Sequence, residues 1–377
     1  MHTAGEKAMR KNRPIVMLAN GHSPFDTRIF VKQARSLTQA GYLVSIIVPH
    51  ASHEIREGIV IIASPQRKSG FGKLFINPIS IFRRAISQPT DAIFCVHDSD
   101  ILITGLLLKL FRRTVIYDAH EDTPLQISYQ HWIPKFLRKP YAALYYLIEK
   151  ASGHLFDAII VAEPVIAKYF PSSKTHLVRN FPFAKDFESI PVKPFDQRRN
   201  AIAYVGTLSR VRGLFQMLDA AKMASEKCSF EFVLGGNFAP GTLEQEVLTN
   251  YEVTYLKWVN YNDLVALLAD CKLGMILPNP VERYKTNYPV KMFEYMAAGV
   301  PVLGSREGES AQFVREATCG VLVNPLDTQE IANAIVDLLG NPSQAEQMGM
   351  NGRKAVMEKL NWENESQVLL ALYQKLE

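Results

Sequence analysis

Two oppositely charged residues, Lys291 and Glu294, stand three positions apart in the segment TNYPVKMFEYMAAGVPVL, residues 286–303. On a helix this spacing places both side chains on one face. A glutamate there can accept hydrogen bonds from a pair of sugar hydroxyls. An amine beside a helix N-terminus, where free N–H groups point outward, suits a phosphate. The pair therefore predicts a site for a diphosphate and a ribose. The alternative is an ion pair on the surface of an ordinary helix.

The residues around this pair predict the element that must hold it. Pro289 suits the first turn of a helix, where a backbone N–H has no partner in any case. Val290, Phe293 and Ala297 are apolar and three to four positions apart, as one face of a helix requires. Gly299 suits the left-handed position that ends a helix. The apolar run after it indicates a short buried strand.

The run PVKMFEYMAAGVPV resembles the nucleotide-sugar motif of retaining glycosyltransferases of family 4, which belong to glycosyltransferase group 1. The resemblance implies an α/β, GT-B fold, with two Rossmann-like parallel-sheet domains facing a central cleft. It also implies that Glu294 binds the ribose hydroxyls. Many relatives carry another glutamate eight residues earlier, in contact with the donor sugar. Here Thr286 occupies that position, which leaves the donor sugar open.

A second stretch, GTLSRVRG at 206–213, resembles the family loop G-R-L-x-x-x-K-G, whose Arg and Lys bind the donor diphosphate. Thr207 stands at the Arg position and Arg212 at the Lys position. An arginine can replace lysine at a phosphate, Arg210 is additional, and Lys291 can supply the missing charge. The alternative is that the arginines lie in solvent. The residues expected at the donor are Gly206, Thr207, Arg210, Arg212, Asn287, Tyr288, Pro289, Val290, Lys291 and Glu294.

The N-terminal half begins with a strand–loop–helix–strand pattern. Residues 14–19 and 44–48 are apolar and predict strands, and 29–40 predict a helix between them, so the sheet is expected to be parallel. Ligands collect at the carboxyl ends of such strands. The loop from residue 20 to 28 lies at such an end and resembles the family loop that faces the acceptor. Its candidate residues are Gly21, His22, Asp26 and Arg28, although Asp26 and Arg28 suit helix caps equally well.

Two later strands of this half end in polar clusters that contain His97 and His120. A histidine beside carboxylates can be oriented by them and have its pKa adjusted. The resemblance implies that a histidine of this half approaches the reacting carbon of the donor sugar, and His97 matches by position. The expected catalytic residues are His97, His120, Arg212 and Lys291. Asp98-Ser99-Asp100 also matches the D-x-D pattern of a metal–diphosphate site, but the GT-B resemblance predicts no metal and no cofactor.

The composition of the chain favours a globular protein over one that binds nucleic acid or spans a membrane. The chain has 377 residues, 47% of them hydrophobic and 21% charged, which suits a globular protein of two domains. A net charge of +5 is too small to predict nucleic acid as a partner. The four cysteines are widely spaced, as in a reducing compartment. The apolar runs are too short for a signal peptide or a membrane span, so a cytoplasmic location is expected.

Two stretches, 66–90 and 129–148, combine basic residues with aromatic and aliphatic ones. This combination suits the surface of an anionic membrane, and the alternative is a solvated basic face over a core stripe. We therefore expect peripheral association with the inner face of the plasma membrane.

The expected domains are 1–190 on the acceptor side, 191–358 on the nucleotide-sugar side, and a helix at 359–377 that returns to the first domain. The resemblance implies transfer of a sugar from a UDP- or GDP-sugar to a hydroxyl of a glycan or lipid-linked acceptor, with retention, in lipopolysaccharide, capsule or exopolysaccharide synthesis. The alternatives are a GT-B epimerase or hydrolase, and a non-catalytic assembly subunit.

Overall fold

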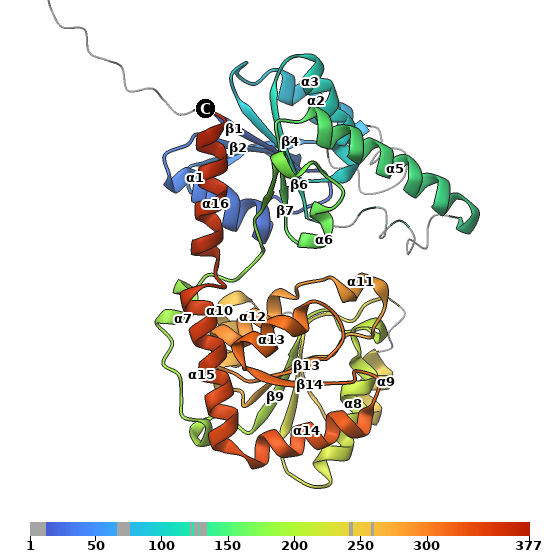
Figure 1. Ribbon diagram of the computed structural model, residues 1–377, viewed down its shortest axis with the longest axis vertical. Coiled ribbons are helices and arrows are strands. Elements are labelled where there is room, and N and C mark those ends of the chain that lie inside the picture. The colour runs from blue at the N-terminus through green and yellow to red at the C-terminus, as the bar shows by residue number, and fades with distance from the viewer. Residues whose placement is uncertain are drawn as a thin grey trace, which may run out of the picture. The chain divides into compact units, whose positions relative to one another are not determined.

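A computed structural model describes residues 13–65, 76–120, 123, 127, 134–240, 244–257 and 260–377. The chain forms two compact units (Figure 1). The first comprises residues 1–179 and 365–377, and the second comprises residues 180–364. The boundary lies between Arg179 and Asn180, not after residue 190 as the sequence predicted. The physical reason is that Phe181 and Phe187 are buried in the core of the second unit, where Phe181 packs on Phe293.

The first unit contains an eight-stranded sheet in the order β3-β4-β2-β1-β5-β6-β7-β8. The strands are β1 (Ile15–Leu18), β2 (Val44–Pro49), β3 (Glu54–Arg56), β4 (Ile59–Ser64), β5 (Ile93–Val96), β6 (Thr114–Ala119), β7 (Ala158–Val161) and β8 (Thr175–Leu177). All neighbours pair in parallel except β3, which is antiparallel to β4. The predicted parallel sheet is therefore confirmed, with one short, charged edge strand that the sequence did not predict.

Helices surround this sheet. They are a π-helical segment (Thr27–Ala34) continuing into α1 (Arg35–Gln39), then α2 (Asn77–Ile86), α3 (Leu102–Leu110), α5 (Lys135–Leu155) and α6 (Pro164–Ala167). The C-terminal helix α16 (Trp362–Lys375) contributes residues from 365 onward to this unit. Its Tyr373 is fully buried and contacts the ring of Tyr42, which secures the end of the chain to the first domain.

The second unit contains a six-stranded, fully parallel sheet in the order β11-β10-β9-β12-β13-β14. Its strands are β9 (Ala201–Val205), β10 (Glu231–Gly235), β11 (Thr254–Leu256), β12 (Leu273–Ile276), β13 (Val302–Ser305) and β14 (Gly320–Val323). Apolar runs in the sequence predict the first five of these, at 201–205, 230–234, 253–259, 273–277 and 300–303. β14 begins with a glycine and is only partly buried, so its hydrophobic signal is weak.

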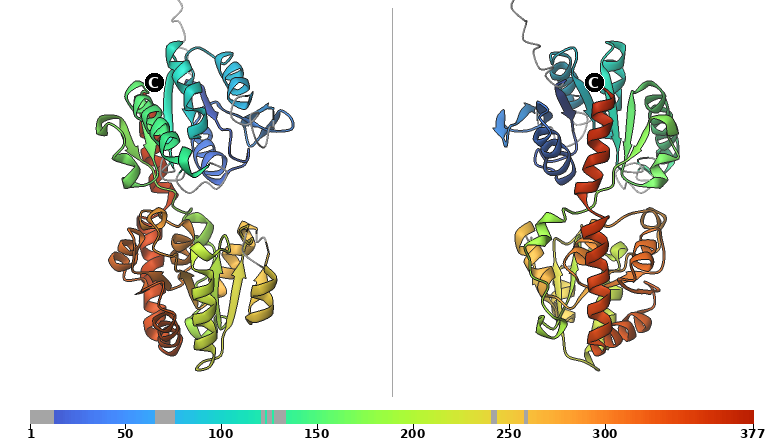
Figure 2. Two further views of the ribbon diagram at one scale, coloured as in Figure 1. Left: turned by 90° about the vertical axis from the view of Figure 1, so that its right-hand side faces the viewer. Right: turned by 60° about the vertical axis from the view of Figure 1, so that its left-hand side comes forward.

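Helices cover both faces of the second sheet, as Figure 2 shows. They are α7 (Lys185–Glu188), α8 (Leu214–Ser225), α9 (Glu244–Asn250), α10 (Tyr261–Asp270), α11 (Glu282–Lys285), α12 (Val290–Ala297), α13 (Ser310–Ala317), α14 (Thr328–Gly340) and α15 (Pro342–Glu358). One core layer contains α8 and α14, and the other contains α10, α12 and α15. Both units are therefore doubly wound α/β domains, in which loops at the carboxyl ends of the strands form the natural ligand sites.

Candidate functional site

The helix α12 forms as its sequence predicts, with Val290 as its first residue and Pro289 just before it in an extended conformation. Lys291 and Glu294 lie on one face, with 2.9 Å between Lys291 Nζ and Glu294 Oε2. The Glu294 side chain is only 5% exposed, while that of Lys291 is 31% exposed. A buried carboxylate whose amine partner remains accessible is unlike a solvated surface pair. This geometry favours the ligand-binding interpretation over the surface ion pair.

Two arginines, Arg198, which is buried, and Arg353, which is half-buried, contact the C-terminal end of α12. Arg353 donates a hydrogen bond of 2.7 Å to the carbonyl of Ala297, and Arg198 donates one of 2.9 Å to the carbonyl of Gly299. Cations at this end satisfy the free carbonyls and oppose the negative end of the helix dipole. Gly299 has the positive φ of 71° that was expected for the helix stop. The helix that carries Glu294 is therefore rigidly held.

The loop after β9 is built by close backbone approaches. A Cβ atom on Gly236 would lie 2.0 Å from the carbonyl oxygen of Gly206, so only glycine fits there. Gly213 has a φ of 76°, and a Cβ there would lie 1.9 Å from the carbonyl oxygen of Leu277. Asn279 also donates a 3.0 Å hydrogen bond to the backbone carbonyl of Arg210. Residues just after β10 and β12 therefore pack closely against this loop and fix its backbone.

The two arginines of this loop have different surroundings. Arg210 forms an ion pair with Glu246 of α9 at 3.6 Å, and its guanidinium lies over the ring of Phe215 of α8 at 4.0 Å. The side chain of Arg210 therefore contacts the two neighbouring helices. These contacts do not test its predicted donor role, which stays a prediction. Arg212 instead lies beside Tyr204. Burial raises the pKa of Tyr204 to about 12, although the guanidinium of Arg212 opposes that shift. Of the two arginines in this loop, Arg212 is therefore the better candidate to bind an anion.

The other residues predicted at the donor gather before α12. Thr286, Asn287 and Pro289 are half-buried in the turn between α11 and α12. Tyr288 donates a 3.3 Å hydrogen bond to Glu309, from the loop that follows β13. Thr207 accepts a 3.0 Å hydrogen bond at its backbone carbonyl from the Tyr204 hydroxyl. Thr207 therefore shapes the loop through its backbone.

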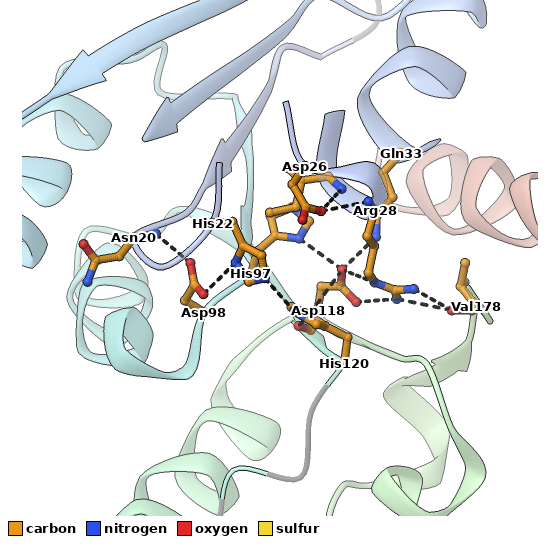
Figure 3. Close-up of polar contacts among 11 residues, drawn as sticks. Asn20, His22, Asp26, Arg28, Gln33, His97, Asp98, Asp118, His120 and Val178 are labelled. Carbon is orange, nitrogen blue, oxygen red and sulfur yellow. Dashed lines mark hydrogen bonds and ion pairs between the residues drawn. The ribbon is translucent and has the colours of Figure 1, made fainter. Parts of the chain in front are cut away.

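In the first domain, the buried carboxylate of Asp118 organises the polar residues at the strand ends (Figure 3). Arg28 donates two hydrogen bonds to it, at 2.9 and 2.6 Å, in a bidentate pair. Gln33 donates another at 2.7 Å, and His97 Nδ1 lies 3.0 Å from the same carboxylate. Burial raises the pKa of Asp118, but Arg28 and His97 outweigh burial and hold that pKa well below its usual range.

Three of the predicted site residues make contacts that support the fold. Arg28 was predicted on the acceptor side, but its guanidinium is buried against Asp118 and the carbonyl of Val178. Asp26 caps the helix, accepting hydrogen bonds from the N–H groups of residues 28 and 29. His97 was the preferred catalytic histidine, yet it is only 1% exposed, because its strand end lies beneath the surface. Arg28 and His97 are buried and can position a site, whereas Asp26 is half-buried; the substrate contacts predicted for them stay predictions.

Two further histidines at these strand ends, His22 and His120, are partly exposed, and their Nε2 atoms lie 3.4 Å apart. His22 Nδ1 lies 2.8 Å from Asp98, and His120 Nδ1 lies 3.1 Å from the backbone carbonyl of Asp118, so both Nδ1 atoms must donate. A hydrogen bond between the two Nε2 atoms then requires one ring to be protonated. Burial lowers the pKa of His22, but Asp98 outweighs it and the pKa is raised, so we assign the charge to His22.

The D-x-D pair has other partners. Asp98 accepts hydrogen bonds from the N–H groups of Asn20, at 2.6 Å, and Gly21, at 3.0 Å. Asp100 accepts one of 2.6 Å from the Asn20 side chain. Across the described residues, no group of three or more His, Cys, Asp or Glu side chains is arranged to hold a metal ion. The two aspartates thus shape the Gly21–His22 loop.

Comparison with known proteins matches residues 186–355 to the family described as Glycosyl transferases group 1. Among curated proteins, the MMP alpha-(1->4)-mannosyltransferase of Mycolicibacterium hassiacum is 22% identical over 295 residues, which are 74% of this chain and 70% of that protein. A GDP-mannose-dependent alpha-(1-6)-phosphatidylinositol monomannoside mannosyltransferase of Mycolicibacterium smegmatis is 35% identical over 69 residues, 18% of each chain.

Solved structures agree in fold. Sucrose-phosphate synthase from Thermosynechococcus elongatus superposes with a TM-score of 0.75 at 21% identity, covering 97% of this chain and 99% of that one. HepE of Anabaena in complex with UDP gives a TM-score of 0.70 at 14% identity, covering 96% and 100%.

The fold and the matched domain define a GT-B glycosyltransferase that uses a nucleotide-sugar donor. The match to the glycosyl transferases group 1 family covers residues 186–355, which lie within the second domain.

Sequence reasoning missed three residues that organise these sites: Asp118 as the centre of the first, Tyr204 beside Arg212, and Tyr295 in α12. Asp118 lies near the end of β6, and this position in a polar cluster at a strand end was the available signal. Tyr204 and Tyr295 lie within apolar runs, where a tyrosine is indistinguishable from an ordinary core residue.

Proposed function

We propose that this glycosyltransferase transfers a sugar with retention at the anomeric carbon, and that its donor binds between α12 and the loop 206–213. The observation that carries the proposal is the buried Glu294 beside the accessible Lys291 at the start of a rigid helix. Glu294 would accept hydrogen bonds from the two ribose hydroxyls. Lys291, Arg212 and the N-terminus of α12 would neutralise the diphosphate.

The proposed reaction follows from this charge distribution. The bond between the anomeric carbon and the diphosphate oxygen breaks, and its electron pair leaves with the diphosphate. The acceptor oxygen bonds to the same face of that carbon, and its proton passes to the departing phosphate oxygen. Positive charge at Lys291 and Arg212 stabilises the oxygen on which negative charge develops. The chemistry needs no metal or cofactor, so activity should survive EDTA, and loss restored by Mn²⁺ would contradict this part.

We further propose a glycan or lipid-linked acceptor and an anionic membrane as a partner, as in cell-surface polysaccharide synthesis. The support is α5, which projects from the first domain in Figure 1. Leu144 and Leu147 are 52% and 61% exposed, and Phe136 is 78% exposed, whereas Glu149 on the other side of the helix is buried. Basic residues, among them Lys135, Lys139 and Lys150, flank this apolar stripe. The stretch 66–75 and residues 129–133 lie outside the described residues.

Exposed apolar side chains with adjacent positive charge suit binding at the interface of an anionic bilayer. Among the described residues, no helix is long and apolar enough to cross a membrane. We therefore propose a cytoplasmic protein bound at the inner face of the plasma membrane. Flotation with vesicles containing phosphatidylglycerol should recover the wild type at low salt. Leu144→Ser with Leu147→Ser should abolish recovery, and Leu326→Ser, which alters an equally exposed leucine of the second domain, should not.

Acceptor dependence tests the reaction itself. Incubation of the protein with UDP- and GDP-sugars alone should release little nucleotide, and release should rise when a crude lipid-linked glycan fraction is added. Rapid turnover without acceptor would instead indicate an epimerase or hydrolase. Failure to bind either nucleotide diphosphate by calorimetry would indicate the non-catalytic subunit.

A further inference from the structure

Val205 is the last residue of β9, directly before Gly206 and the arginine-containing loop. Neighbouring residues of a strand direct their N–H groups to opposite sides. The N–H of Gly206 binds the carbonyl of Gly235 in β10, so the N–H of Val205 faces β12. β9 and β12, however, pair only at Ile202 and Ala203, with Leu273 and Gly274. Beyond that point, the amide of Val205 needs a partner from outside the sheet.

The partner is Tyr295 of α12. Its hydroxyl oxygen accepts a hydrogen bond of 3.0 Å from the N–H of Val205, and both groups are buried. Its ring lies against Gly274, where a Cβ atom would come within 2.5 Å of the ring. The phenol ring therefore occupies the space that a side chain at position 274 would fill. Tyr295 is fully buried, so the contact is shielded from water.

This contact joins the two parts of the proposed donor site. Tyr295 follows Glu294 in α12, and Val205 precedes the loop that carries Arg212. α12 and β9 are ninety residues apart in the sequence, and this hydrogen bond links them side chain to backbone. A ligand that contacts both Glu294 and Arg212 needs a fixed distance between them. A shift of the helix against the strand end would misplace one group relative to the other.

We infer that Tyr295 is a positioning residue for the donor nucleotide, setting α12 against the loop 206–213. The inference rests on the proposed function, since it takes the nucleotide diphosphate to contact both elements. Tyr295→Phe keeps the ring against Gly274 and removes only the hydroxyl. It leaves the amide of Val205 without its buried acceptor, which loosens the end of β9.

We expect Tyr295→Phe to fold and to bind UDP or GDP about five- to tenfold more weakly than the wild type by calorimetry. Amide hydrogen exchange should accelerate in peptides covering residues 201–213 and remain unchanged elsewhere in the domain. Tyr251→Phe is the matched control. It removes a phenol that donates to Asp219 at 2.7 Å in the same domain, and it should leave the affinity unchanged.

The outcomes separate the inference from its premise. A wild-type protein that binds neither nucleotide refutes the proposed function, and the inference falls with it. Wild-type binding that Tyr295→Phe leaves intact, or weakens no more than Tyr251→Phe does, refutes the inference alone. If Tyr295→Phe does not fold, Gly274→Ala offers a second route. Its Cβ displaces the ring while keeping the hydroxyl, and it should reproduce the weaker binding and the faster local exchange.

Discussion

Replacing Glu294 with alanine tests the ribose assignment. The carboxylate is almost completely buried, and its partner Lys291 is about one-third exposed. An i,i+3 pair on a helix contributes only about 0.2–0.5 kcal/mol to stability, so the domain should remain folded. Hydrogen bonds from ribose hydroxyls to a charged carboxylate contribute about 1–3 kcal/mol to binding. The dissociation constant for the nucleotide diphosphate should therefore rise by about 5- to 150-fold.

The assay is calorimetric titration of wild type and Glu294→Ala with UDP, GDP and their 2′-deoxy forms. Loss of the 2′-hydroxyl should weaken binding to the wild type and have little effect on the variant, because the hydroxyl's partner is already absent. This cycle isolates the contact from any general loosening of the site. Glu231→Ala serves as the control, since its ion pair with Arg199 lies at the opposite, N-terminal end of β10.

Equal losses on removing the 2′-hydroxyl in wild type and variant would refute the contact. An unchanged affinity for UDP and GDP in a folded Glu294→Ala protein would refute the assignment of this residue to the nucleotide. In either case the buried pair on α12 would have a structural role only.

Asp118→Asn should destabilise the first domain by about 3–5 kcal/mol in urea unfolding, because the buried Arg28 loses its counter-charge, and a loss below about 1 kcal/mol would contradict this. Stability should also depend on pH through His22 and Asp98. Burial opposes charge on Asp98, but His22 and backbone N–H groups lower its pKa to about 2. Its contribution is therefore present above the ordinary value of 3.8 and lost as pH falls toward 2. The pKa of His22 is raised, so its contribution is present below 6.5 and lost as pH rises through the raised value. His22→Ala should flatten both changes, and an identical pH profile would exclude the pair as their source. Gly213→Ala should weaken nucleotide binding and destabilise the second domain by about 1–3 kcal/mol, because the φ of Gly213 is positive and a Cβ there would meet a backbone carbonyl. A variant as stable as the wild type would contradict this close approach.

The sequence predicted the elements that depend on local patterns. The helix α12, its glycine stop and the first five strands of the second sheet follow from apolar spacing and from Pro289 and Gly299, and the structure contains them. These features are readable because each depends on neighbours only a few residues away. The match of the second domain to a glycosyltransferase family likewise rests on one contiguous segment.

The environment of the polar side chains could not be predicted in this way. Arg28 and His97 are charged or polar residues at strand ends, as ligand-binding residues commonly are, yet both face the buried Asp118 from the core side. Their burial depends on contacts across 90 and 21 residues of sequence. Spacing alone does not distinguish a side chain that supports a site from one that lines it.

The most direct test of the account is a crystal structure of the protein with UDP or GDP bound. We predict the ribose hydroxyls within hydrogen-bonding distance of Glu294, and the diphosphate beside Arg212, Lys291 and the start of α12. A nucleotide bound elsewhere, with Glu294 still paired only to Lys291, would contradict the central claim.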